Sequence, residues 1–383
     1  MLFHGGLETV HTTLAEWLVA RGWDVTLLVG RTDWPGSALE LLPCPIVVDE
    51  ALWEWGFPPT TKATRAVMKH GAGVLRELAP TVLISALGHG IHWAARAARV
   101  PVVLEYLHCA GSWDLLDHPA DGIIGVSGWT LETVAAERPR MPGLRWVVHN
   151  GLPGRVLPGP GGRERVRRAH GWSREHRVVG FVGRLAPEKR IDEWMHAFAD
   201  LRAQAGESVQ GLVVGKLYDG AQLEIAQGVA VERGLGWGQD VQWVEALSGQ
   251  MPDMYAAMDL LLHTRTEEPF GMVVIEAMGA GCPVAAYAGG GIPEIEPHCG
   301  GALVLAPVGD RAALVRLAAL ALEDGRLAGD HAAAIAGHFS ADRMVDAVEA
   351  IMLELMGGET DAVLVHGADR VRAGSDNKAV AAR

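Results

Sequence analysis

The sequence predicts an α/β protein of two domains, each built on a mostly parallel sheet with helices between its strands. Short apolar stretches of strand length alternate with segments of helical periodicity along most of the chain. A chain of 383 residues is long enough for two cores of ordinary size. The Pro- and Gly-rich stretch 153–162 reads as the linker between them. We therefore expect a first domain over residues 1–152, a second over 153–337, a helix over 338–357 and a disordered tail over 358–383.

The composition excludes several classes of function. A net charge of -13 argues against sequence-independent binding to nucleic acid or to anionic lipid, since both require a basic surface. No run of about 18 uninterrupted apolar residues is present, and the start does not resemble a signal peptide. The 4 cysteines show no paired metal spacing and no disulfide framework. We expect a cytoplasmic protein without strong membrane association and with reduced thiols.

Two features of the first half are candidate site elements. Gly5 and Gly6 form a glycine-rich turn at the start of a predicted helix, ahead of the apolar strand 25–29. Further strands are predicted over 81–85 and 100–104, and His108 closely follows the second of them. Ligands of open α/β sheets gather at the carboxyl ends of strands, which makes His108 a candidate. A purely structural turn and a histidine packed on its aromatic neighbour are the alternatives.

Cations follow the first strand of the second half. The predicted strand 178–182 ends at Gly183, and Arg184 and Lys189 flank the turn before the next helix. Two cations at the end of a strand suit a diphosphate, because arginine binds it bidentately and lysine acts as a point charge. An ordinary pair of surface cations is the alternative. The four arginines just after the linker predict a solvated helix face; they are Arg163, Arg165, Arg167 and Arg168.

The most informative stretch lies between the predicted strands 260–262 and 283–287, which should be joined by a crossover helix. Glu268 falls in the loop before this helix and Glu276 about two turns inside it, so the two carboxylates should lie roughly 10 Å apart and line one groove. A free helix N-terminus binds anions through its N–H groups. The groups expected here belong to Phe270, Gly271, Met272 and Val273.

These residues resemble a known signature. The Glu268 and Glu276 pair, with Phe270-Gly271 between them, is similar to the E-x7-E signature of retaining glycosyltransferases of the GT-B fold, family 4. Gly183 to Lys189 resembles the family's Gly-Arg-Leu-x-x-x-Lys-Gly segment, with arginine where its last glycine is common. The resemblance extends from Gly5 to about residue 356. It implies two Rossmann-like domains facing a central cleft, with the C-terminal helix crossing back to the first domain.

The resemblance also implies residue roles. Glu268 would bind sugar hydroxyls, Glu276 the ribose, and His108 would face the donor sugar. Arg184, Lys189 and the helix N-terminus would stabilise the leaving diphosphate. The implied catalytic residues are His108, Glu268, Arg184 and Lys189. The implied donor-binding residues are Gly5, Gly6, Arg184, Lys189, Val244, Ala246, Glu268, Phe270, Gly271, Met272, Val273 and Glu276, with Val244 and Ala246 contacting the base through their backbone.

The expected reaction moves a sugar from a nucleoside-diphosphate sugar, with UDP the expected nucleotide, to a hydroxyl of a small-molecule acceptor such as a natural product. We expect retention of configuration, no cofactor and no metal, since no Asp-x-Asp motif is present. A phosphorylase, a sugar-nucleotide epimerase, a transferase for lipid or cell-wall acceptors and a non-catalytic nucleotide-binding module remain as alternatives. No Gly-x-Gly-x-x-Gly follows a strand where an oxidoreductase would need it. The sugar, the base, the acceptor and the oligomeric state stay open.

Overall fold

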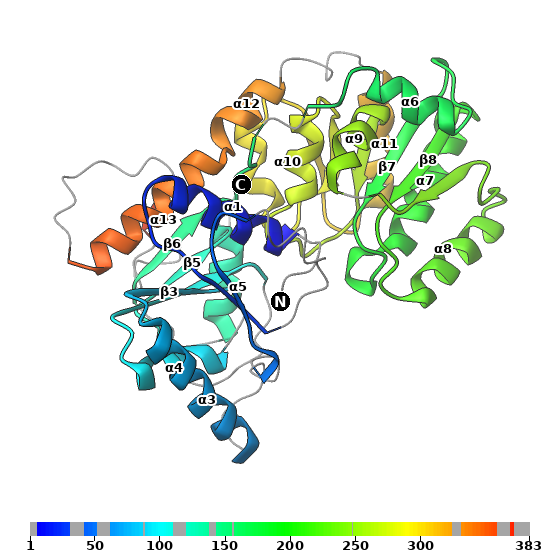
Figure 1. Cartoon of the computed structure of the whole chain (residues 1–383). Coiled ribbons are helices and arrows are strands. Elements are labelled where there is room, and N and C mark those ends of the chain that lie inside the picture. The colour runs from blue at the N-terminus through cyan, green and yellow to red at the C-terminus, as the bar shows by residue number, and fades with distance from the viewer. Residues whose placement is uncertain are drawn as a thin grey trace. The chain divides into compact units, whose positions relative to one another are not determined.

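The computed structural model divides into two compact units, one formed by Met1–Gly151 together with Ala341–Arg383 and the other by Leu152–Ser340. Figure 1 shows the elements of both. The structure describes residues 6–30, 42–51, 62–86, 89–109, 120–137, 143–154, 157–246, 248–323, 331–357 and 368–370.

The first unit is an α/β unit with a parallel sheet. Strands β3, β4, β5 and β6 are parallel neighbours in chain order, and β13 pairs antiparallel with β6. The strands are β1 (Leu27–Val29), β2 (Ile46–Val48), β3 (Val82–Ser85), β4 (Val102–Leu107), β5 (Gly122–Gly125), β6 (Arg145–Val148) and β13 (Ala368–Arg370). The helices are α1 (Gly6–Ala20), α3 (Lys62–Leu78), α4 (His89–Ala98), α5 (Gly128–Glu137) and α13 (Ala341–Leu355). Strand β13 lies in the segment where the sequence predicts disorder, and the other described strands of this sheet match the predicted alternation.

The C-terminal helix α13 returns to the first unit and packs on α1, as the sequence predicts. Arg21, just after α1, forms ion pairs with Asp342 and Asp346 at 2.7 Å and with Glu349 at 2.8 Å. The indole N–H of Trp23 donates to Glu349 at 2.6 Å. These contacts join residues more than three hundred positions apart, so the first unit is completed only when the end of the chain has folded back.

The second unit is built on a six-stranded parallel sheet in the order β12-β11-β10-β7-β8-β9. Its strands are β7 (Arg177–Val182), β8 (Val209–Val214), β9 (Val241–Val244), β10 (Leu260–His263), β11 (Val284–Tyr287) and β12 (Leu303–Ala306). Its α-helices are α6 (Gly162–Ala169), α7 (Ile191–Ala205), α8 (Gly220–Glu232), α9 (Met251–Ala257), α10 (Met272–Gly279), α11 (Arg311–Glu323) and α12 (His331–His338). The chain proceeds outward from β7 in one direction and then, from β10, in the other. This order creates a topological switch point between β7 and β10, where open α/β sheets bind ligands.

The core of the second unit attaches α7 to β7. Trp194 and Phe198 of α7 are both fully buried and stack with ring centroids 5.1 Å apart. The indole N–H of Trp194 donates to the carbonyl of Gly180 in β7 at 3.1 Å, so the one polar atom of this aromatic pair is satisfied. Gly180 is required on the other side, because a Cβ there would lie 2.1 Å from the sulfur of Met258.

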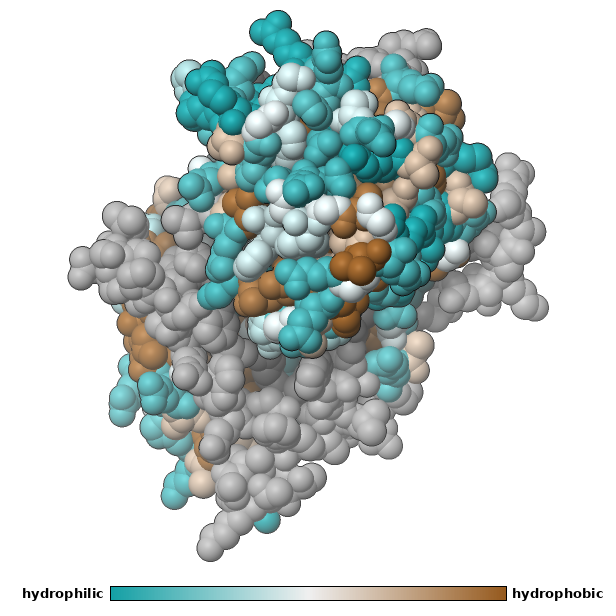
Figure 2. All heavy atoms as spheres, turned by 90° about the vertical axis from the view of Figure 1, so that its right-hand side faces the viewer, coloured by the Kyte–Doolittle hydropathy of each residue, from teal (hydrophilic) through white to brown (hydrophobic). Residues whose placement is uncertain are grey.

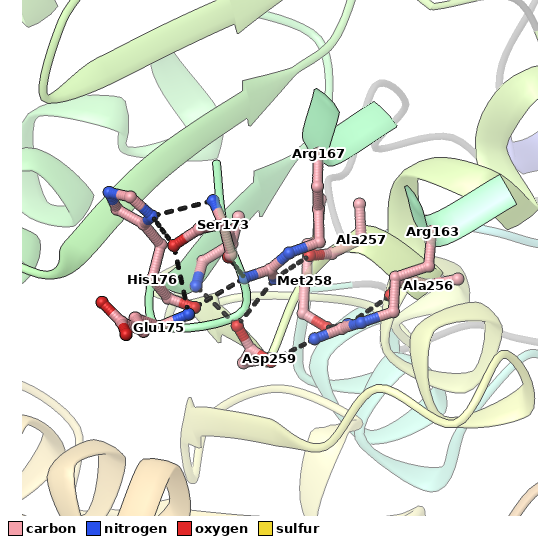
Figure 3. A network of polar contacts seen from close by, with 10 residues as sticks. Arg163, Arg167, Ser173, Glu175, His176, Ala256, Ala257, Met258 and Asp259 are labelled. Atoms are coloured by element: carbon pink, nitrogen blue, oxygen red, sulfur yellow. Dashed lines mark hydrogen bonds and ion pairs between the residues drawn. The ribbon is translucent and has the colours of Figure 1, made fainter. Parts of the chain in front are cut away.

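The arginines of α6 correct one prediction. Figure 3 shows Arg163 and Arg167 converging on Asp259, at 2.6 Å and 3.1 Å. Asp259 also accepts from the backbone N–H of Val178 at 2.7 Å. Arg167 is only 5% exposed, so the prediction of a solvated helix face is wrong for it. The network attaches α6 to the first strand of the sheet, which the local charge pattern does not reveal.

The visible surface of the second unit is mixed in character. Figure 2 shows hydrophilic residues interspersed with smaller hydrophobic spots. Scattered exposed apolar residues are normal on protein surfaces. Within the described part of the chain, no helix is long and apolar enough to cross a membrane.

Candidate active site

The candidate site lies at the switch point of the second unit, where the loops after β7 and β10 begin. The loop after β7 leads through the short 3-10 helix η2 (Pro187–Lys189), and the loop after β10 leads to Glu268 and the start of α10. A glycine-rich turn fixes the second loop. The N–H of Gly291 donates to the carbonyl of Glu268 at 2.8 Å, and a Cβ on Gly290, whose φ is +63°, would lie 2.1 Å from the same oxygen. Glu268 therefore stands on a backbone that is tightly packed.

Glu268 is surrounded by cationic and imidazole groups. Its Oε2 accepts from Lys189 Nζ at 3.1 Å and from Arg265 Nη1 at 3.1 Å. His263, the last residue of β10, places its Nε2 3.8 Å from the same oxygen. Glu268 is 8% exposed and His263 is 7% exposed. A nearly buried carboxylate is tolerated here because two cations compensate its charge.

This arrangement determines the protonation states. Burial would by itself raise the pKa of Glu268, but Lys189 and Arg265 outweigh it and lower the pKa to about 2. Burial lowers the pKa of His263 to about 4; the neighbouring Glu268 opposes this shift, and the two cations add to it. At neutral pH the cluster thus holds an ionised Glu268 and an uncharged His263. A carboxylate held in its charged form is suited to binding and electrostatic stabilisation rather than to proton transfer.

The N-terminus of α10 lies directly after Glu268 in the chain. Gly271 is the N-cap residue of the helix, with φ 111° and ψ 56°, and as a glycine it supplies no side-chain cap. The positive φ favours glycine here, and a Cβ at this position would lie 2.5 Å from Ile292 Cδ1, so the isoleucine side chain would have to shift. Met272 and Val273 form the first turn, where backbone N–H groups have no intrahelical acceptor. The positive end of the helix dipole is consequently available to an anion.

Glu276 lies in the second turn of α10 and has a different environment. Its Oε2 accepts from the hydroxyl of Tyr255 at 2.6 Å, and no described cation pairs with it. Burial raises the pKa of Glu276 to about 7, and the hydrogen bond from Tyr255 opposes that shift. The two glutamates of the signature are therefore unequal: Glu268 is held ionised, and Glu276 can change protonation near neutral pH.

The two predicted cations after β7 are not equivalent either. Lys189 reaches Glu268, and its aliphatic stem passes over Gly183, where a built Cβ would lie 3.7 Å from it. Arg184 instead contacts Glu188 at 3.4 Å and lies over the ring of Tyr218, 5.1 Å from the ring centroid. The structure thus brings Lys189 and Glu268 together, whereas the diphosphate clamp formed by Lys189 and Arg184 stays a prediction.

His108 lies in the first unit, beside a second histidine that the sequence reading did not select. His11 Nε2 and His108 Nε2 are 3.0 Å apart, and the rings of His108 and Tyr106 are 4.5 Å apart. Burial and the neighbouring His11 lower the pKa of His108 well below its ordinary value. One ring nitrogen must donate to the other, so at least one of the two imidazoles carries a proton on Nε2. The role of His108 toward a sugar stays a prediction.

The remaining predicted residues are placed as follows. Gly5 lies outside the described residues, and Gly6 begins α1. The carbonyl of Val244 accepts from the N–H of Gly215 at 3.0 Å, so it belongs to the β8–β9 ladder. Ala246 follows β9 and is partly exposed. Base contacts by these two residues stay a prediction.

Sequence reasoning missed three polar residues of this site. His263, placed just outside the predicted strand, completes β10 and faces Glu268. Arg265 and Tyr255 supply the hydrogen bonds to the two signature glutamates. Polar residues beside a signature glutamate are a signal for Arg265 and His263, but nothing local connects Tyr255 with Glu276. Among the described residues no group of three or more His, Cys, Asp or Glu side chains could hold a metal ion.

Comparison with known proteins identifies relatives of this chain. The family model described as glycosyl transferases group 1 matches residues 162–336, which contain the whole Glu268 cluster. A GDP-mannose-dependent alpha-mannosyltransferase of Mycobacterium tuberculosis (strain CDC 1551 / Oshkosh) is 31% identical over 272 residues, covering 66% of this chain and 65% of the relative. A 2-deoxystreptamine glucosyltransferase of Streptomyces kanamyceticus is 32% identical over 253 residues, covering 60% and 64%. The chain thus spans less than two thirds of the length of these relatives.

Solved structures identify the fold. Anabaena Alr3699/HepE, crystallised with UDP and glucose, superposes with a TM-score of 0.75 at 20% identity, over 91% of this chain and 96% of that one. WaaG, a glycosyltransferase involved in lipopolysaccharide biosynthesis, superposes with a TM-score of 0.62 at 18% identity, over 94% and 99%. Together with the two parallel sheets and the return of α13 to α1, this confirms the predicted GT-B fold.

Proposed function

Because the chain belongs to the glycosyl transferases group 1 family, we propose that it transfers a sugar from a nucleoside-diphosphate sugar to a hydroxyl of a small-molecule acceptor, with retention of the anomeric configuration. The observation that carries the proposal is the Glu268 cluster at the switch point. The ionised carboxylate of Glu268 precedes the N-terminus of α10 by a few residues, and it accepts from Lys189, which the separate loop after β7 supplies. The carboxylate suits the sugar hydroxyls and the lysine and helix N-terminus suit the diphosphate, so together these groups suit a sugar attached to a diphosphate.

The chemistry follows from these groups. Breaking the bond between the anomeric carbon and the diphosphate oxygen leaves negative charge on the diphosphate. Lys189 and the N–H groups of Met272 and Val273 are cationic or polar donors that stabilise such charge. Because the pKa of Glu268 is about 2, its carboxylate is ionised at neutral pH and accepts hydrogen bonds from sugar hydroxyls. Glu276 accepts from a ribose hydroxyl in its ionised form.

The proposed retention of the anomeric configuration rests on the ion pairs that hold Glu268. A double displacement needs a carboxylate nucleophile and a second group that acts as acid and base. Glu268 is tied to Lys189 and Arg265 through Oε2, which disfavours attack by this carboxylate. We propose attack of the acceptor on the face from which the diphosphate leaves, with a departing phosphate oxygen taking the acceptor proton.

Two donors and two acceptor classes compete. UDP is the nucleotide that we expect, and GDP-mannose is the competing donor because it appears in the name of the mannosyltransferase relative. The relative named for 2-deoxystreptamine favours a small cyclic polyol as acceptor. A natural-product or cell-wall precursor with free ring hydroxyls would present the same chemistry.

The test is a panel of UDP-, GDP-, ADP- and dTDP-sugars offered to the purified protein in EDTA. Binding and slow hydrolysis are followed by release of the nucleoside diphosphate. We expect one donor to be selected, and we expect Lys189→Ala and Glu276→Ala to lose most of its binding. The matched control is Arg168→Ala, because Arg168 is an exposed cation of α6 with no role in the site.

Each outcome has a definite meaning. Selection of one donor by the wild type, with loss in the two site variants only, supports the transferase. Donor affinity that is unchanged in both site variants contradicts the assignment of Lys189 and Glu276. Release of a sugar 1-phosphate on addition of orthophosphate would instead indicate a phosphorylase, and interconversion of two nucleotide sugars without acceptor an epimerase.

A further inference from the structure

The Glu268 cluster contains one cation more than its carboxylate needs. Lys189 and Arg265 both contact Oε2, and His263, with its pKa lowered to about 4, is uncharged at neutral pH. These three groups come from η2, the loop after β10, and β10 itself. One cation is enough to neutralise one carboxylate. The other is therefore available to an anionic ligand without leaving Glu268 uncompensated.

The two cations differ in how they are attached. Lys189 belongs to the separate loop after β7 and carries its charge on a flexible stem over Gly183. A lysine ammonium is a compact charge with three rotatable donors, which can turn from one anion to another. Arg265 belongs to the same loop as Glu268, three residues earlier in sequence, and its side chain is 19% exposed. Since that loop is clamped by Gly290 and Gly291, Arg265 and Glu268 keep their relative positions when Lys189 moves.

From this difference we propose that Arg265 is a positioning residue, which keeps Glu268 ionised and oriented toward the donor sugar while Lys189 binds the diphosphate. The inference rests on the proposed function and deepens it. Through Glu268, Arg265 gives the site its preference for a nucleoside-diphosphate sugar over the free nucleoside diphosphate. Neither the signature nor the cation pair after β7 includes this residue.

The two oxygens of Glu268 support the assignment. Lys189 and Arg265 donate to Oε2, and His263 also lies nearest to Oε2. In the described part of the chain no side chain is hydrogen-bonded to Oε1. Arg265 thus holds one oxygen and leaves the other to accept from a sugar hydroxyl. Removing Arg265 would free the carboxylate to rotate and would raise its pKa, because Arg265 is one of the two cations that oppose the effect of burial.

The experiment compares binding of a nucleoside diphosphate with binding of the selected nucleoside-diphosphate sugar, by isothermal titration calorimetry. The variants are Arg265→Gln, Arg265→Lys and the surface control Arg168→Gln. For Arg265→Gln we expect the sugar nucleotide to bind about tenfold more weakly and the nucleoside diphosphate to bind nearly as in the wild type, since a charge-assisted contact is lost on the sugar side only. Arg265→Lys should recover most of the preference, and Arg168→Gln should keep all of it.

A pH series separates positioning from a merely structural role. The wild type should keep its preference as pH falls from about 7 to about 5, because the pKa of Glu268 lies at about 2. Arg265→Gln should lose part of this preference over the same interval, as Glu268 becomes protonated at a higher pH, whereas the titration of Glu276 acts on the ribose that both ligands share.

The outcomes are distinct from those of the proposed function. If the wild type binds no nucleoside diphosphate, the proposed function fails and this inference fails with it. If the wild type binds both ligands and Arg265→Gln keeps the same ratio of affinities, the proposed function stands and the inference is overturned. If Arg265→Gln weakens both ligands equally, Arg265 serves the diphosphate or the fold, which also overturns it.

Discussion

Replacing Glu268 by glutamine should lower the free energy of unfolding by about 3–4 kcal/mol at neutral pH. The ordinary pKa of 4.5 and the folded value of about 2 differ by about 2.5, and each pKa unit corresponds to about 1.4 kcal/mol of preference for the ionised form. Solvent screening is slight, since Glu268 is 8% exposed. The amide removes the charge but keeps the shape, so the loss reports the interaction with Lys189 and Arg265.

The direction of the pKa shift of Glu268 determines how its contribution to stability depends on pH. A carboxyl group whose folded pKa is depressed contributes stability above its unfolded pKa, here about 4.5, and this stability is lost as pH falls through the folded value of about 2. Urea unfolding of wild type and Glu268→Gln should therefore differ most at about pH 7 and converge as pH falls below about 4.5. The control Glu188→Gln, at a carboxylate paired with Arg184 and 43% exposed, should change stability by less than about 0.5 kcal/mol. Equal stability of wild type and Glu268→Gln at neutral pH, or a difference that does not change with pH, would refute the reasoning.

Three further predictions use other parts of the second unit. Affinity for the nucleoside-diphosphate sugar should rise with pH through about 7, the pKa of Glu276, because the ionised carboxylate is the stronger acceptor for a ribose hydroxyl; calorimetry should find this dependence absent in Glu276→Gln. Asp259→Ala should cost roughly 3–5 kcal/mol in denaturant unfolding, because it leaves two arginines of α6 without their carboxylate. Gly290→Ala should weaken both stability and donor binding, since its Cβ would lie 2.1 Å from the carbonyl oxygen of Glu268. Gly234→Ala is its matched control, with φ +69° and nothing within 4 Å of a Cβ, and a loss of equal size in the two glycine variants would show that steric contact is not the cause.

The candidate site was predictable to the extent that it is local in sequence. Glu268, Gly271 and Glu276 fall within one loop and one helix, so their spacing and the flanking strands place them together. The partners of the two glutamates were not predictable in this way. The hydrogen bond between Lys189 and Glu268 joins residues 79 positions apart, and the one between Tyr255 and Glu276 joins residues 21 positions apart.

Two arginines show the same limit of prediction from sequence. Arg184 and Lys189 look alike in the sequence, yet only Lys189 reaches Glu268, because Arg184 lies over Tyr218. Arg167 looks like a solvated residue of a charged helix, yet Asp259 and three carbonyl groups surround its guanidinium. Charge and spacing along one segment carry no information about which distant segment packs against it.

The sequence by itself determined the α/β class, the succession of strands and helices and the two signature glutamates, because apolar periodicity and short motifs act over a few residues. Only the tertiary structure decided the strand order that places β7 beside β10 and the partners that hold Glu268 ionised while Glu276 has a pKa of about 7. The physical reason is that ionisation depends on burial and on the charges within a few ångströms, and these are supplied by residues that are neighbours in space and not in sequence.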